Sequence, residues 1–77
     1  MEMMILGLKE FKTKKDKECY MVNCGMEREN VLGMDIASYF TTKEHYDKFA
    51  PLVGKKVDTK KDVAVFYDKN AIYVRKH

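Results

Sequence analysis

A single amphipathic helix, placed after three strand-like segments and before two more, constrains the fold of this chain more than any other feature. Thr41 and Glu44 fit a capping box, in which the two side chains satisfy backbone N–H groups at a helix start. Pro51 is expected to end the regular helix near Ala50, and Gly54 to redirect the chain. The apolar or amphipathic stripe of this helix comprises His45, Tyr46, Phe49, Leu52 and Val53. Few small folds place one helix at this point, so the element order limits the choice of fold.

Runs of strand-forming residues surround this helix. They cover residues 3–12, 19–24 and 31–40 before it, and 63–67 and 71–75 after it. The polar segments 13–18, 25–30 and 68–70 suit turns. Residues 55–62 fit either the first half of a long fourth strand or a loop.

The third segment shows the clearest strand pattern. Its even positions are mostly apolar, whereas Asp35 marks the odd face, so we expect the even face to be buried. This interpretation assigns Phe40 to the core and makes Tyr39 the ring most exposed to solvent.

Size and composition indicate one small globular domain over residues 1–77. Hydrophobic residues make up 45% of the chain and charged residues 35%, and the net charge is +3. A small positive charge permits an anionic partner without requiring one. The sequence contains no glycine-rich phosphate loop, histidine–carboxylate cluster or nucleophile elbow. We therefore expect a non-enzymatic protein without a cofactor.

The cysteines argue against a disulfide or a metal site. Cys19 and Cys24 have an odd separation, which places them on opposite faces of one strand. They lack a second cysteine pair, and His45 and His77 are distant in sequence, so no metal is expected. Reduced cysteines are typical of a cytoplasmic protein. Residues 1–8 are too short for a membrane span and lack the basic start of a signal peptide, so no membrane partner is expected.

The element order and three stretches of sequence resemble small OB-fold single-stranded DNA-binding proteins of bacteriophages and mobile elements. The stretches are a strand entering a lysine-rich hairpin (8–17), the segment after the helix (53–58) and a late strand (65–68). The resemblance implies a mainly β, five-stranded antiparallel OB-like barrel, with one helix between the third and fourth strands. Barrels of this type bind oligonucleotides on the face of strands 2 and 3 and through neighbouring loops.

Candidate nucleic-acid-binding residues are cations that would neutralise phosphates and rings that would stack on bases. They are Phe11, Lys12, Lys14, Lys15, Lys17, Tyr20, Tyr39, Lys60, Lys61, Tyr73 and Arg75. Each type has an alternative structural explanation. Lysines keep hairpin tips soluble and discourage edge pairing, and aromatic side chains more often pack in cores.

Two functions follow from this pattern. The leading hypothesis is single-stranded nucleic-acid binding, most simply of single-stranded DNA. The alternative is a protein-interaction module that pairs through an exposed strand edge or the helix. An all-β regulator that binds no nucleic acid is a third interpretation. The sequence is also compatible with a homodimer or a higher homo-oligomer, because one such domain offers a short site and open strand edges.

Overall fold

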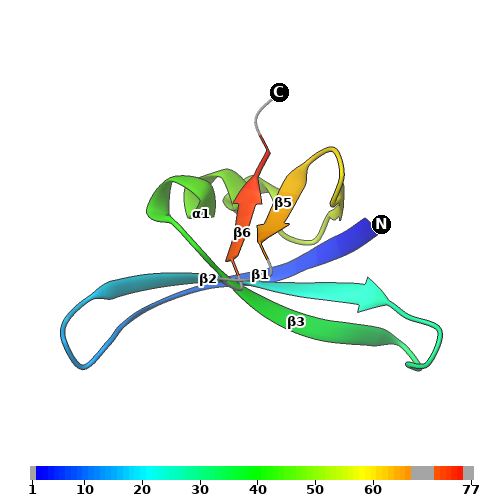
Figure 1. Cartoon of the computed structure of the whole chain (residues 1–77), viewed down its shortest axis with the longest axis horizontal. Coiled ribbons are helices and arrows are strands. Elements are labelled where there is room, and N and C mark those ends of the chain that lie inside the picture. The colour runs from blue at the N-terminus through cyan, green and yellow to red at the C-terminus, as the bar shows by residue number, and fades with distance from the viewer. Residues whose placement is uncertain (1, 67–70, 76–77) are drawn as a thin grey trace.

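Six strands and one short helix form the molecule, in a computed structural model that describes residues 2–66 and 71–75 (Figure 1). The strands are β1 (Glu2–Lys12), β2 (Glu18–Glu27), β3 (Met34–Thr41), β4 (Lys56–Asp58), β5 (Val63–Phe66) and β6 (Ala71–Val74). Helix α1 spans Lys43–Phe49 and continues into a 3-10 turn, η1, at Ala50–Leu52. The turn expected at 68–70, the strand end at Tyr67 and the second histidine, His77, lie outside the described residues.

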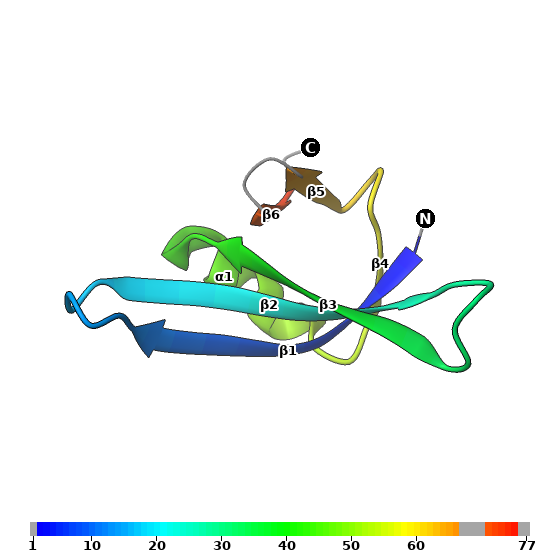
Figure 2. The same ribbon diagram turned by 60° about the horizontal axis from the view of Figure 1, so that its bottom comes forward.

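The strands form a nearly closed barrel with the order β4-β1-β2-β3-β6-β5 (Figure 2). The predictions of a mainly β barrel and of one helix after the third strand are confirmed. The prediction of five antiparallel strands is wrong in detail. The described residues form six strands, and β6 runs parallel to β3, with Phe40 opposite Ala71.

A turn between β4 and β5 accounts for the additional strand. The Asp58 carboxylate accepts a hydrogen bond from the Lys60 backbone N–H at 2.7 Å, and the Asp62 carboxylate accepts one from the Asp58 N–H at 2.9 Å. These bonds form a local Asx-type turn that competes with extended pairing. The fourth strand is therefore interrupted, so that β4 pairs with β1 and β5 pairs with β6.

Helix α1 begins one residue later than the predicted capping box. Thr42 is the N-cap, and its hydroxyl accepts the His45 backbone N–H at 3.3 Å. Glu44 instead pairs with Lys48 at 3.5 Å, one turn along the helix. The helix ends as predicted, since Pro51 lies in the 3-10 turn and Gly54 has a φ of +83°.

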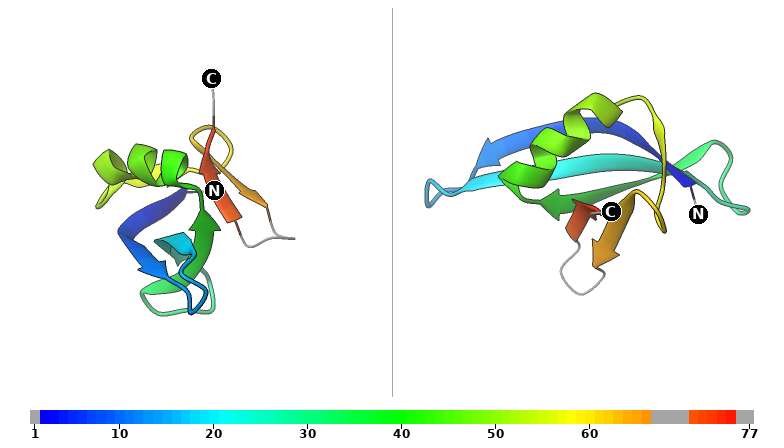
Figure 3. Two further views of the ribbon diagram at one scale, coloured as in Figure 1. Left: turned by 90° about the vertical axis from the view of Figure 1, so that its left-hand side faces the viewer. Right: turned by 90° about the horizontal axis from the view of Figure 1, so that it is seen from above.

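The helix covers one opening of the barrel, where it lies beside β6 (Figure 3). Phe49 is fully buried among residues of the strands, which identifies the helix as a plug for the core. His45 Nδ1 accepts the Val74 backbone N–H at 3.0 Å, and the His45 ring packs edge-on to Tyr73 at 4.9 Å. The histidine thus has a structural role that ties α1 to β6.

Candidate nucleic-acid interface

The face of β3 that packs on the core is the odd-numbered one, not the even-numbered one predicted. Its even positions point outward, where Ile36 is 67% exposed and Phe40 is 45% exposed. Tyr39 packs against the buried cluster together with Ala37. The sequence correctly predicted that the side chains of β3 alternate between two faces, but the buried and exposed faces are exchanged. Tyr39 is therefore corrected from an exposed stacking ring to a core-packing residue, and Phe40 from core to surface.

Cross-strand register explains this reversal and builds an outward row. Tyr39 lies opposite the fully buried Val22, so both side chains point to the barrel interior. Phe40 consequently lies opposite Met21, and Met21 lies opposite Lys9 on β1. Three neighbouring strands thus place an aromatic ring, a flexible thioether and an ammonium group side by side on the outer surface.

Phe11 extends this row toward the β1–β2 hairpin. It lies two residues from Lys9 along β1 and therefore on the same face. The Lys9 ammonium lies 5.6 Å from the centre of the Phe11 ring, within cation–π distance. We call the set Lys9, Phe11, Met21 and Phe40 the aromatic face.

Small and polar residues lie beside the aromatic face. The adjacent cross-strand row contains Gly7, Asn23 and Ser38. The Ser38 hydroxyl donates to Asn23 Oδ1 at 2.7 Å. A Cβ atom built at Gly7 would meet nothing within 4 Å, so the surface is open here. A planar group can therefore approach the β1 backbone beside Lys9, two strands from Phe40.

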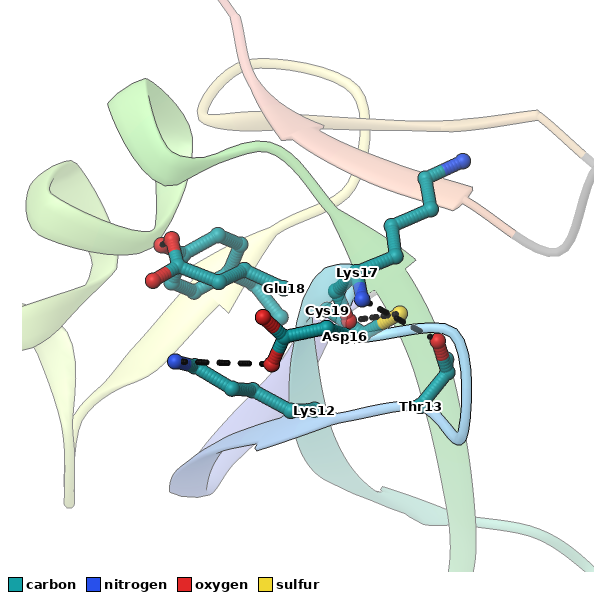
Figure 4. A network of polar contacts seen from close by, with 7 residues as sticks. Lys12, Thr13, Asp16, Lys17, Glu18 and Cys19 are labelled. Atoms are coloured by element: carbon teal, nitrogen blue, oxygen red, sulfur yellow. Dashed lines mark hydrogen bonds and ion pairs between the residues drawn. The ribbon is translucent and has the colours of Figure 1, made fainter.

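A lysine-rich hairpin joins β1 to β2 at one end of this face (Figure 4). The Thr13 N–H donates to the Lys17 carbonyl at 2.9 Å, and the Lys17 N–H donates to the Thr13 hydroxyl at 3.2 Å. Asp16 adopts a left-handed φ of +63°, which tightens the turn. The side chains of Lys12 and Lys17 extend in different directions from the hairpin (Figure 4).

The hairpin is electropositive because few of its cations are neutralised. Lys12 makes a long ion pair of 3.8 Å with Asp16, and both side chains are exposed. Within the described residues, Lys14, Lys15 and Lys17 have no carboxylate within ion-pair distance. These solvated ammonium groups are available to a phosphate chain.

Tyr20 does not belong to the aromatic face. Its ring lies 5.2 Å from that of Tyr46 on α1, and the Lys43 ammonium lies 5.7 Å from its centre. Its hydroxyl donates to Glu18 at 2.9 Å, and this hydrogen bond raises the Tyr20 pKa above its ordinary value. Tyr20 thus connects the end of β2 to the helix, and its predicted stacking role would lie outside the aromatic face.

The second basic stretch lies at the other end of the sheet. Asp58, which precedes Lys60 and Lys61, pairs with Glu2 at the start of β1, whereas the lysine hairpin follows the end of β1. Ten residue steps of an extended strand separate these ends by about 33 Å. The structure therefore does not bring the two basic stretches together.

Arg75 and Tyr73 also have structural contacts. Arg75 donates from Nη2 to the carbonyls of Thr59 at 3.2 Å and Val63 at 3.3 Å, across the turn between β4 and β5. Its guanidinium stabilises this turn, so the prediction that Arg75 binds nucleic acid is not supported by its contacts. Tyr73 packs on His45, as described above.

The two cysteines lie on opposite faces of β2, as the sequence predicts. Cys24 lies opposite Ile5 in the barrel interior, whereas Cys19 lies opposite Phe11 on the outer side, and both are free. Burial raises the pKa of the Cys24 thiol to about 11. Within the described part of the chain, no three metal-ligating side chains gather, and no helix is long and apolar enough to cross a membrane.

Comparison of the chain with protein-family models, curated proteins and solved structures gives no match. The assignment of the aromatic face as a candidate site therefore depends only on the geometry of this molecule. Sequence reasoning found Phe11 and the hairpin lysines but missed Met21 and Phe40. The alternation in residues 31–40 carried a usable signal, because it showed two faces, but it did not show which of them is turned outward.

Proposed function

We propose that this barrel is of the OB type and that it binds single-stranded nucleic acid, with single-stranded DNA as the simplest ligand. The connectivity supports the fold assignment. Three consecutive antiparallel strands, a helix, an interrupted fourth strand and a last strand parallel to β3 form the described barrel. Fold likeness alone does not establish a function, so the proposal depends on the outer surface.

The observation that carries the proposal is the aromatic face beside the lysine hairpin. Phe40 and Phe11 provide rings on which bases stack, which contributes about 1–3 kcal/mol per base in such proteins. Lys9 and the hairpin lysines neutralise phosphates and release counterions. Exposed apolar side chains on adjacent strands are costly unless they have a partner. Base stacking accounts for the exposed rings of this surface, and phosphate binding accounts for its lysines.

An unpaired strand suits this surface better than a duplex. Stacking on Phe40 requires a base whose flat side is exposed, and bases within a duplex are already stacked on each other. Ser38 lies next to that ring on β3, and its row continues through Asn23 to the open surface at Gly7 on β1. They contact a base edge or sugar without requiring one sequence. We therefore expect little sequence preference.

A salt series with a fluorescently labelled oligothymidine tests the proposal. We expect binding at low salt that weakens as salt rises, with a logarithmic slope of about −0.7 per neutralised phosphate. The double variant Lys14→Ala/Lys15→Ala should weaken binding and flatten this slope. The matched control, Lys60→Ala/Lys61→Ala, removes the same charge from the distant turn and should change both quantities less.

Absence of binding at low salt would refute the proposal. Equal effects of the two double variants would show that only net charge attracts the oligonucleotide. The alternative function is a protein-interaction module that pairs through an exposed strand edge or the helix.

A further inference from the structure

A hollow on the helix side of the barrel belongs to neither the core nor the aromatic face. Its volume of about 330 Å³ lies in the range of small-molecule sites. It is lined by segments that are distant in the sequence, namely the end of α1 with η1, the segment that enters β4, the turn after β4 and the end of β6. Helix α1 and β6 contact each other, so the fold joins these segments into one surface (Figure 3).

The floor of the hollow is apolar. It is formed by Leu52, Val57 and Val74. Val57 is buried, and Leu52 and Val74 pack against the core cluster. These aliphatic side chains donate no hydrogen bonds, so the floor suits the flat or apolar part of an organic molecule better than a bare inorganic anion.

Four exposed cations surround this floor. They are Lys48, Lys55, Lys56 and Arg75. Lys48 pairs with Glu44 at 3.5 Å. In the described part of the chain, none of the other three cations lies within ion-pair distance of a carboxylate. The hollow therefore holds three positive charges that are not neutralised by direct pairing.

The acidic residues nearby do not reverse this balance. Asp62 is the carboxylate in the lining, and it accepts the Asp58 backbone N–H at 2.9 Å. Asp58 and its strand partner Glu2 are offset by Lys60 and Lys61 in the adjoining turn. The charges around the hollow therefore favour an anionic ligand.

Hydrogen bonds hold the cationic side of the hollow in place. The Lys55 N–H donates to the Leu52 carbonyl at 2.9 Å, and the Ile5 N–H donates to the Lys55 carbonyl at 3.1 Å. The two carbonyls that bind Arg75 Nη2 fix its guanidinium, and as neutral groups they leave its charge in place. A site that is formed in advance binds its ligand with a smaller loss of conformational freedom.

We propose that this hollow binds a small organic phosphate of the nucleotide type. A terminal phosphate carries a charge of about −1.5 to −2 and three acceptor oxygens, which suits lysines and an arginine that approach from separate segments. The apolar floor takes the flat base. The Asp62 carboxylate has further acceptor capacity, which suits a sugar hydroxyl. The proposal uses residues outside the aromatic face and does not rest on the proposed function.

Titration of the ¹⁵N-labelled full chain with adenosine 5′-monophosphate, followed by NMR, tests this proposal. We expect amide shifts in residues 52–57 and 74–75 that saturate with a dissociation constant of about 1 mM or below. Adenosine lacks the phosphate and inorganic phosphate lacks the base, so each should bind roughly tenfold more weakly. These comparisons use the unchanged chain and do not depend on the folding of a variant.

The double variant Lys55→Ala/Lys56→Ala should raise the dissociation constant for the nucleotide roughly tenfold, because it removes two unpaired ammonium groups. The matched control, Lys14→Ala/Lys15→Ala, removes the same charge from the hairpin and should leave this constant unchanged. All four lysines are exposed, and the hydrogen bonds of Lys55 use its backbone. Both variants should therefore fold, which far-UV circular dichroism verifies.

A free nucleotide and the 5′ end of a strand present the same terminal group. Weaker binding of a 5′-phosphorylated adenosine dinucleotide would support the free nucleotide as the ligand, whereas equal or tighter binding would support a strand end.

Absence of saturable shifts up to about 10 mM nucleotide would overturn the proposal. Adenosine that binds as tightly as the nucleotide would overturn it as well, and so would equal losses from the two double variants. Shifts confined to the aromatic face would reject the hollow while leaving the proposed binding of single-stranded nucleic acid in place.

Discussion

The inner and outer faces of the β1–β3 sheet use the same three strands and similar side chains, yet only the inner one is covered. Inside, Ile5, Val22 and Cys24 are fully buried beneath Phe49 from the helix. Outside, Met21 and Phe40 pack in an equally regular row with no described element over them. The comparison teaches that a hydrophobic strand residue stabilises the fold on one face and is available for recognition on the other.

The strongest test of this comparison replaces one phenylalanine on each face of the sheet by alanine. Phe49→Ala should lower the free energy of unfolding by about 3–5 kcal/mol, because it removes a fully buried ring and leaves a cavity. A domain of this size has a total stability of only about 4–12 kcal/mol, so the variant should be marginally folded. Phe40→Ala should cost only about 1 kcal/mol, because its half-exposed ring loses a cross-strand contact without leaving a buried cavity. Urea denaturation measures both, and similar losses would contradict the assignment of faces.

Adjacent residues of β3 sharpen the comparison in binding. Phe40→Ala should weaken oligothymidine binding by about 1–3 kcal/mol, a change of roughly five- to 150-fold, because it removes a stacking ring. Tyr39→Phe keeps its ring in the core and should leave the affinity unchanged. Fluorescence anisotropy at one low salt concentration measures both variants. Unchanged affinity of Phe40→Ala would show that the outer ring is not the one that stacks.

The reactivity of the two cysteine thiols provides a chemical comparison of the same two faces. Burial holds the pKa of the Cys24 thiol near 11, so this group stays protonated and shielded at pH 8. Cys19 is partly exposed on the outer side of the sheet. Iodoacetamide should therefore modify Cys19 first and Cys24 only after denaturation. Peptide mass spectrometry distinguishes the sites, and Cys19→Ser verifies the assignment, since it should leave the native protein almost unlabelled.

The smallest expected effect concerns the turn that divides the fourth strand. The hydrogen bond from the Lys60 backbone N–H lowers the pKa of Asp58 below its ordinary value of 3.8. A lowered folded-state pKa means that the ionised carboxylate stabilises the fold above about pH 4, and that this contribution is lost as the pH falls through the folded-state pKa. The wild type should therefore lose thermal stability in this range more steeply than Asp58→Asn. Parallel melting curves from pH 6 to pH 3 would argue against this role.

Much of the element order was predictable because it depends on local signals. Polar hairpin residues, the Pro51 stop and the alternation of β3 each act within a few residues. The site was predictable only in part. The sequence identified Phe11 and the hairpin lysines, whereas Tyr39 and Phe40 were assigned to the wrong faces. The cap at Thr42 instead of Thr41 shows that even a local signal leaves a one-residue choice.

The sequence alone determined that this chain forms strands around one capped helix, that its first hairpin is basic and that its two cysteines occupy opposite faces. Each of these depends on neighbouring residues and on the two-residue period of a strand. Only the tertiary structure decided which face of β3 points outward, that β6 runs parallel to β3 and that the basic stretches lie at opposite ends of the sheet. The physical reason is that alternation defines two faces without ranking them. The register with β2 and the position of Phe49 then select the face that is buried.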